Sequence, residues 1–122
     1  MKLQQDSAPS QNMITAYGAG YVEINKERHA RNLIVLPQRI VPWAAAGFAT
    51  LSDADVRALS DLAPEIVLLG TGRSQRFPTP LTLRPLIDAG IGYEVMDLMA
   101  ACRTYNILVV EGRKVAAALL LD

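Results

Sequence analysis

Four consecutive residues, Gly70-Thr71-Gly72-Arg73, form the strongest pattern for binding chemistry in the chain. They follow an apolar run, and open α/β sheets bind ligands where strands of this kind end. Exposed backbone N–H groups in such a turn, together with Arg73 and Arg76, could hold an anion. However, the lysine of a phosphate-binding P-loop is missing, and Phe77-Pro78 separates the turn from the next helix. A plain strand-exit turn is therefore the alternative interpretation.

Asp97 and Cys102 are the next candidates for chemistry. Asp97 ends a neighbouring apolar run, where a carboxylate whose pKa is raised by burial could act as a general base. Aspartate is also favoured at a helix N-cap, and we prefer that interpretation. Cys102 falls in the apolar stripe of the following helix, and buried cysteines of this kind are inert. We therefore expect no catalytic residue in the chain.

Arg103 and Asn106 lie three positions apart, so they share the less apolar face of that helix. Such a pair could line a pocket or a partner surface, and a solvated face is the simpler alternative. Asparagine is a weak residue in the middle of a helix, so we expect the Asn106 amide to bind a neighbouring loop. Glu111-Gly112-Arg113 is expected only to end the helix, with Gly112 in a left-handed turn.

Composition limits the classes of function. The 12 basic and 12 acidic residues cancel, whereas proteins that bind nucleic acid through its phosphates normally carry a basic surplus. One cysteine and one histidine leave no internal disulfide and no multi-cysteine or multi-histidine metal site. The longest apolar run, Val115–Leu121, is far shorter than the roughly 20 residues that span a bilayer. We expect a soluble cytoplasmic domain that binds no cofactor, metal or nucleic acid, and zero net charge does little to oppose self-association.

The first half of the chain is expected to be rich in antiparallel strands. Residues 1–12 are expected to form a flexible lead-in, followed by a single domain over residues 13–122. A hairpin turn or bulge explains Gly18 and Gly20, and a charged turn is expected at Glu27–Arg31. Pro42 favours an edge position for the last strand, because proline cannot donate to a ladder. The expected strands are Met13–Ala16, Tyr21–Asn25, Asn32–Leu36 and Ile40–Trp43.

From Ser52 onward, helices and strands alternate. Ser52 and Asp55 have the spacing of a capping box, Thr79-Pro80 would begin a second helix that ends at Gly90, and Asp97 would cap a third. The expected strands between and after them are Glu65–Gly70, Tyr93–Met96 and Val115–Leu121. This order implies right-handed crossovers and a partly parallel sheet between helical layers. The sequence thus predicts one three-layer α/β domain with a mixed central sheet and a βαβαβ second half.

An apolar stretch from Pro42 to Phe48 follows the fourth expected strand. Part of it must pack on the core. An exposed Trp43 or Phe48 would instead suggest a protein interface, because large aromatic side chains anchor partner contacts.

Four segments carry a resemblance to a known family: LLGTG (68–72), GIGYEVMD (90–97), AACRTYNIL (100–108) and EGRKVAAAL (111–119). They resemble the domain-of-unknown-function 498 family closely from Glu65 to Leu119, and more loosely through Gly18–Gly20 and Ile40–Trp43. The resemblance implies a compact three-layer α/β domain with a mixed sheet and no established reaction. A mitochondrial member is an assembly factor for respiratory complex I, which implies a protein partner. Relatives often have threonine at the position of Leu98, where Asp97 is expected to supply the cap instead.

Two functions from different classes follow. The first is a non-catalytic protein-binding or assembly-assisting factor. The second is an anion-binding or small-molecule-binding protein, possessing at most a minor enzymatic activity, with a pocket at the strand ends near Gly70 and Asp97. It predicts that five side chains converge on one cavity: Thr71, Arg73, Asp97, Arg103 and Asn106. Nucleic-acid binding would require Arg73, Arg76, Arg84 and Arg103 to cluster on one face.

Overall fold

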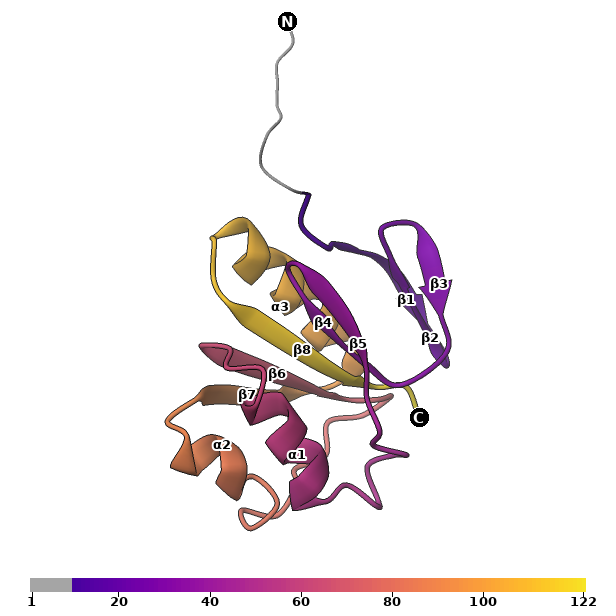
Figure 1. Ribbon diagram of the computed structural model, residues 1–122. Helices are drawn as coiled ribbons and strands as arrows, with labels where there is room; N and C mark the ends of the chain where they lie inside the picture. Colours follow the sequence, from indigo (N-terminus) through magenta and orange to yellow (C-terminus); the bar gives the residue numbers. More distant parts are fainter. Residues whose placement is uncertain (1–9) are drawn as a thin grey trace, which may run out of the picture.

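Two β-sheets and three helices make up residues 10–122, the part of the chain that the computed structural model describes (Figure 1). A three-stranded antiparallel sheet has the order β1-β2-β3, and a five-stranded sheet has the order β5-β4-β8-β6-β7. The elements in chain order are β1 (Ile14–Gly18), β2 (Tyr21–Ile24), β3 (Glu27–His29), β4 (Leu33–Leu36), β5 (Arg39–Pro42), α1 (Asp53–Ser60), β6 (Ile66–Thr71), α2 (Arg84–Asp88), β7 (Gly92–Met96), α3 (Leu98–Val110) and β8 (Val115–Leu120).

The central strand β8 is buried at every position, because both faces of the sheet around it are covered. It pairs antiparallel with β4 and parallel with β6, and β6 pairs parallel with β7. The five-stranded sheet is therefore mixed, as the sequence predicts. Proline-containing β5 lies at one edge, which confirms its expected position, and β7 lies at the other.

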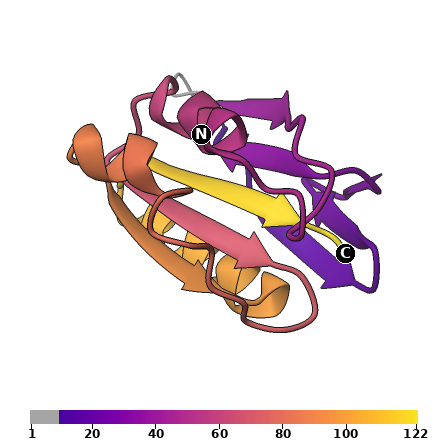
Figure 2. The same ribbon diagram turned by 90° about the horizontal axis from the view of Figure 1, so that it is seen from below.

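The two faces of this sheet carry separate cores. Val115, Ala117 and Leu119 of β8 point into a cluster with α3 and the small sheet, while the alternate residues point toward α1 and α2. Figure 2 shows α1 and α2 over one face and α3 over the other. The expected three-layer α/β architecture is confirmed.

The helix boundaries agree with the sequence at α1 and differ at α2. Ser52 Oγ accepts from the Asp55 N–H at 3.3 Å, and Asp55 Oδ2 accepts from the Ser52 N–H at 3.1 Å, so the capping box is present. The predicted start of α2 at Pro80 is wrong. Residues 80–83 form turns, and the helix begins at Arg84 with Pro85 in its first turn. A second proline five residues downstream satisfies the same helix-start preference.

The expected charged turn at Glu27–Arg31 is also wrong in part, because Glu27–His29 forms β3 and pairs with β2. Its polar sequence suits a short strand that is largely exposed. The turn at Gly20, with φ +76°, is the expected hairpin. Residues 1–9 of the expected lead-in lie outside the described residues. Asn12, the last residue of that lead-in, donates from its backbone N–H to the Pro37 carbonyl at 2.8 Å and from its side chain to the Leu36 carbonyl at 2.8 Å.

Candidate functional site

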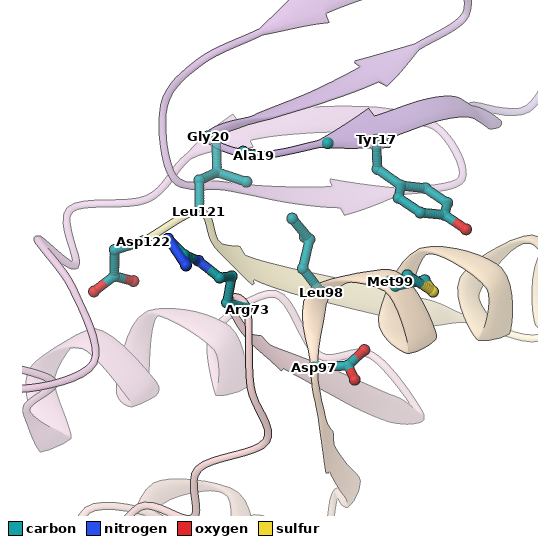
Figure 3. Close-up of a pocket in the computed structure, with 11 residues that line it drawn as sticks. Tyr17, Ala19, Gly20, Arg73, Asp97, Leu98, Met99, Leu121 and Asp122 are labelled. Carbon is teal, nitrogen blue, oxygen red and sulfur yellow. The ribbon is translucent and has the colours of Figure 1, made fainter.

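The carboxyl ends of β6 and β7 lie side by side, because the two strands are parallel and pair from Ile66 to Gly70. Their exits, together with the Gly18–Gly20 turn and the segment after β8, enclose a pocket of about 470 Å³ (Figure 3). Its lining is mostly apolar and includes three charged residues: Tyr17, Gly18, Ala19, Gly20, Gly72, Arg73, Asp97, Leu98, Met99, Leu121 and Asp122.

Thr71 is the last residue of β6, directly before the pocket residue Gly72, and is fully buried. Its hydroxyl donates to the Ser74 carbonyl at 2.7 Å and accepts from the Arg76 N–H at 3.0 Å. Arg76 Nη2 in turn donates to the Thr71 carbonyl at 2.7 Å, and its guanidinium stacks over the Phe48 ring. These bonds close the loop on itself. Thr71 and Arg76 therefore hold the strand-exit turn, and the Thr71 hydroxyl has no remaining proton to donate to a ligand.

The two glycines of the turn have packing and conformational roles. A Cβ at Gly70 would lie 3.0 Å from Ala101 Cβ and 3.1 Å from Leu119 Cδ2, so Gly70 allows α3 to approach β6 closely. Gly72 has φ +84°, and a Cβ there would lie 2.8 Å from the Asp122 backbone. The glycine pattern that suggested anion binding is thus accounted for by the plain turn.

Arg73 is exposed at the mouth of the pocket. In Figure 3 its guanidinium points toward Asp122, whereas the Asp97 carboxylate points away from it. No ion pair of Arg73 is found within residues 10–122. The two charged groups expected at the site therefore line the same pocket without converging on one point.

Asp97 caps α3, as the sequence predicts. Its Oδ1 accepts from the Ala100 N–H at 2.8 Å, and the Leu98 N–H donates to the Gly72 carbonyl at 2.8 Å. Two of the free N–H groups at the helix start are thereby satisfied. The cap fixes the beginning of α3 against the exit of β6.

Cys102 and Tyr105 belong to the buried stripe of α3. Burial raises the pKa of the Cys102 thiol to about 12, so the thiol is protonated at neutral pH and is a poor nucleophile. Burial also raises the pKa of the Tyr105 phenol, which donates to the Asn12 carbonyl at 3.0 Å. The expected structural role of Cys102 agrees with this environment.

Asn106 forms a two-bond clamp between α3 and β1. Its Nδ2 donates to the Ile14 carbonyl at 2.8 Å, and its Oδ1 accepts from the Ile14 N–H at 2.9 Å. The expected structural use of the amide is present, although its partner is a strand and not a loop. Neither Asn106 nor Arg103 lines the pocket. The predicted convergence of five side chains is therefore wrong, since only Arg73 and Asp97 of the five residues line the cavity.

The arginines do not form one basic face. Arg84 lies on α2, where its Nε is 3.4 Å from Asp88 Oδ1, and Arg103 lies on α3 across the sheet. The clustering that nucleic-acid binding would require is absent from the described residues.

Trp43 is 6% exposed and does not form a surface anchor. It packs in the core beneath α1, and its Nε1 donates to the Asp55 carbonyl at 3.0 Å. Phe48 is half-buried against the same core and under the Arg76 guanidinium. The expectation of an exposed aromatic anchor is wrong for Trp43, which is buried, whereas Phe48 is partly exposed and an interface there stays a prediction.

Several residues that organise the site carry no recognisable motif. Tyr17, Met99 and Leu121 line the pocket, although each reads in the sequence as an ordinary apolar residue. Asn32 donates from Nδ2 to the Ala45 carbonyl at 2.9 Å and accepts from the Leu121 N–H at 2.8 Å, so it fixes the segment after β8. The sequence offers one signal for that role, which is that Asn32 is a polar residue directly before the buried strand β4.

Glu65 binds the segment that connects α3 to β8. Its carboxylate accepts from the Lys114 N–H at 2.8 Å and from Arg113 Nε at 3.0 Å. The backbone bond from Lys114, and next the Arg113 guanidinium, lower the pKa of Glu65. Arg113 therefore does more than end the helix, because it joins that end to the start of β6.

No group of three metal-ligating side chains is found between residues 10 and 122. Over the same range no helix has the length and apolar character to cross a membrane.

Fold and site together define a three-layer α/β domain with an open apolar pocket where two parallel strands end. The chain belongs to the family described as "Protein of unknown function (DUF498/DUF598)", which it matches over residues 14–120. This result confirms the resemblance found in the sequence.

Relatives and solved structures agree with that assignment. The bovine protein named NADH dehydrogenase [ubiquinone] 1 alpha subcomplex assembly factor 3 is 32% identical over 98% of this chain, which spans 66% of that protein's length. A crystal structure of a Bordetella parapertussis protein has a TM-score of 0.88 and 42% identity, covering 95% of this chain and 100% of that one. A Bordetella pertussis protein described as a Mth938-like domain has a TM-score of 0.82 and 36% identity, covering 100% and 93%.

Proposed function

We propose that this chain is a non-catalytic protein-binding domain that assists the assembly of an NADH dehydrogenase or a similar respiratory complex. The observation that carries the proposal is its similarity, over 98% of its length, to an NADH dehydrogenase assembly factor. Because the chain spans 66% of that relative, the partner contacts of the remaining third are not assumed for it.

The geometry supports a binding role, because the groups best suited to chemistry are occupied in holding the fold together. Thr71 closes a turn, Asp97 caps α3, and Asn106 clamps β1. The Cys102 thiol is buried and protonated. Nucleophile, base and orienting group would have to lie within hydrogen-bond reach of one another, and these four side chains serve separate contacts.

Affinity purification of the tagged chain from its native host tests this proposal. We expect subunits of a respiratory NADH dehydrogenase to be enriched over a control purification with an unrelated tagged protein of similar size. Purification from both membrane and cytoplasmic fractions without enrichment of any respiratory subunit would contradict the proposal. The same fractions test the cytoplasmic location that we propose for the chain, and light scattering on the purified protein tests whether it self-associates.

A second candidate function is favoured by the pocket beside Arg73. The cavity of about 470 Å³ is mostly apolar and is lined by Arg73 as well as by Asp97 and Asp122, so it suits a small ligand with an apolar body and one anionic group placed at Arg73. A thermal-shift screen with aromatic and aliphatic carboxylates and phosphates tests it, since a ligand of the native state raises the melting temperature. The expected shift disappears in Arg73→Ala and persists in Arg39→Ala, an exposed arginine on β5. If no ligand raises the melting temperature, or if Arg73→Ala and Arg39→Ala show equal shifts, this candidate function is contradicted.

A further inference from the structure

The outward face of α3 is almost free of charge. The helix reads LMAACRTYNILVV, in which Arg103 is the one charged residue. A helix on the surface of a domain normally turns charged and polar side chains outward. Here Met99, Ile107 and Val110 are 51%, 58% and 75% exposed. With Arg103 they are spaced at intervals of three and four, so the four side chains form one stripe along the helix.

The fold does not need this stripe for its own stability. The opposite stripe of α3 already fills the core between the helix and β6 and β8 through Leu98, Ala101, Cys102, Tyr105 and Val109. The Asn106 clamp to Ile14 fixes one flank of the helix against β1, and the Asp97 cap fixes its start. The exposed stripe is therefore presented on a rigid element, and contiguous exposed apolar surface of this kind marks interaction sites.

Arg103 indicates the charge of what covers the stripe. Four arginines each lie within 4.0 Å of a carboxylate, namely Arg57, Arg76, Arg84 and Arg113, and Arg103 is the one of the other five that lies on the α3 stripe. Within residues 10–122 Arg103 has no such ion pair. An apolar surface that buried this guanidinium without a carboxylate would incur a large desolvation penalty. A complementary partner therefore supplies an acid at the middle of its own apolar face.

We propose that the stripe Met99–Arg103–Ile107–Val110 is a docking surface for an apolar helix of a partner protein that carries one aspartate or glutamate opposite Arg103. The inference rests on the proposed protein-binding function and adds the surface and the chemistry of the partner. A second copy of this chain fits poorly. Arg103 lies near the middle of the stripe, so two stripes packed around a two-fold axis would bring two guanidinium groups together.

Photocrosslinking in the native host locates the partner. Val110→benzoylphenylalanine places the reactive group on the stripe, and Leu81→benzoylphenylalanine is the matched control, because Leu81 is 73% exposed and precedes α2 on the other face of the sheet. We expect a discrete adduct from position 110 and none from position 81. Mass spectrometry should map the adduct to an apolar helical segment with a carboxylate about two turns from the attachment point, because Val110 and Arg103 are seven residues apart on α3.

Charge exchange then tests the ion pair. Arg103→Glu should lower the adduct yield about tenfold, because like charges meet across the interface, while Arg39→Glu leaves it unchanged. Replacing the mapped carboxylate with lysine should restore the yield in the Arg103→Glu background. Circular dichroism of both arginine variants checks that the fold is intact.

The outcomes separate this surface from the broader function. An adduct with a second copy, an attachment site without a carboxylate, or equal effects of the two arginine variants would overturn the proposed surface. An adduct from position 81 alone would also overturn the proposed surface, but it would agree with the protein-binding function. Absence of adducts from both positions would contradict the surface, and the purification described above decides whether the function falls with it.

Discussion

At the scale of single residues, three of the five polar side chains expected at the site, those of Thr71, Asp97 and Asn106, make hydrogen bonds within the fold. Asn106 is the clearest case, because both ends of its amide bind the backbone of Ile14. Buried backbone groups that lose a partner cost more than a simple missing contact, since they remain without water. Such residues can look functional in a sequence and still serve architecture.

Removing the Asn106 amide should therefore destabilise the protein. We expect Asn106→Ala to lower the free energy of unfolding by about 1–3 kcal/mol, because the N–H and carbonyl of Ile14 lose their partners. Chemical denaturation measures the loss, and amide exchange at Ile14 should accelerate. Arg103→Ala, an exposed change on the same helix, should alter stability by no more than about 0.5 kcal/mol. Equal stability of the two variants would show that the clamp contributes nothing.

Glu65 gives a pH-dependent prediction. Its pKa is lowered from 4.5 because the charged carboxylate accepts from the Lys114 N–H and from Arg113. A lowered folded-state pKa means that this contribution to stability is present above the unfolded-state pKa and is lost as pH falls through the folded-state value. Glu65→Gln should therefore be less stable than wild type at neutral pH, and the two should converge in strong acid. Urea titrations across the acid range measure the gap, and a gap of constant size would contradict this assignment.

At the scale of elements, α3 is the part on which most of the site depends. It begins at the Asp97 cap, approaches β6 closely at Gly70, and carries both the buried stripe and the exposed stripe. Moving its start would displace the pocket lining at Leu98 and Met99. Two substitutions test the cap and the close approach separately.

The cap interpretation of Asp97 predicts a difference between two substitutions. Asp97→Ala should cost about 1 kcal/mol of stability, whereas Asp97→Asn should be nearly neutral, because asparagine caps helices as well as aspartate does. Thermal and chemical denaturation measure both. If Asp97→Asn abolished function in the host while stability was retained, the carboxylate charge would have a role beyond the cap.

The close approach of α3 to β6 predicts that alanine destabilises the protein at Gly70 but not at Gly92. Gly70→Ala places a methyl group 3.0 Å from Ala101 Cβ and should cost about 1–3 kcal/mol through overpacking. Gly92→Ala is the matched control in the neighbouring strand β7, where the nearest atom to the new Cβ is 3.7 Å away, and it should be close to neutral. Similar denaturation midpoints for both variants would contradict the packing role of Gly70.

Local signals in the sequence were sufficient for elements with strong patterns and insufficient elsewhere. The capping box at Ser52, the cap at Asp97 and the continuous apolar strands were read correctly, because each depends on neighbouring residues. The start of α2 was predicted wrongly, because both Pro80 and Pro85 are compatible with the start of a helix. The strand β3 was not predicted, because its pairing with β2 is a contact that its own sequence does not indicate. The site was predicted only in part. Tertiary contacts decide that Arg73 and Asp97 line a pocket and that Arg103 and Asn106 do not.

At the scale of the whole molecule, the two faces of the central sheet differ in what they leave exposed. One face is covered by α1 and α2, and the other by the small sheet and α3. The pocket opens beside the start of α3, and the exposed apolar stripe runs from Met99 at the pocket along the same helix. Both candidate binding features therefore lie on one side of the molecule, which suits a domain that works by contact with a partner.

Deleting the gene for this chain in its native host and resolving the respiratory complexes on native gels tests the assembly role most directly. We expect the fully assembled NADH dehydrogenase to decrease and a smaller subassembly to accumulate. The wild-type chain and Arg73→Ala should restore assembly, and Arg103→Glu should not. A normal complement of respiratory complexes in the deletion strain would contradict the assembly role, and full rescue by Arg103→Glu would show that the role does not depend on the α3 stripe.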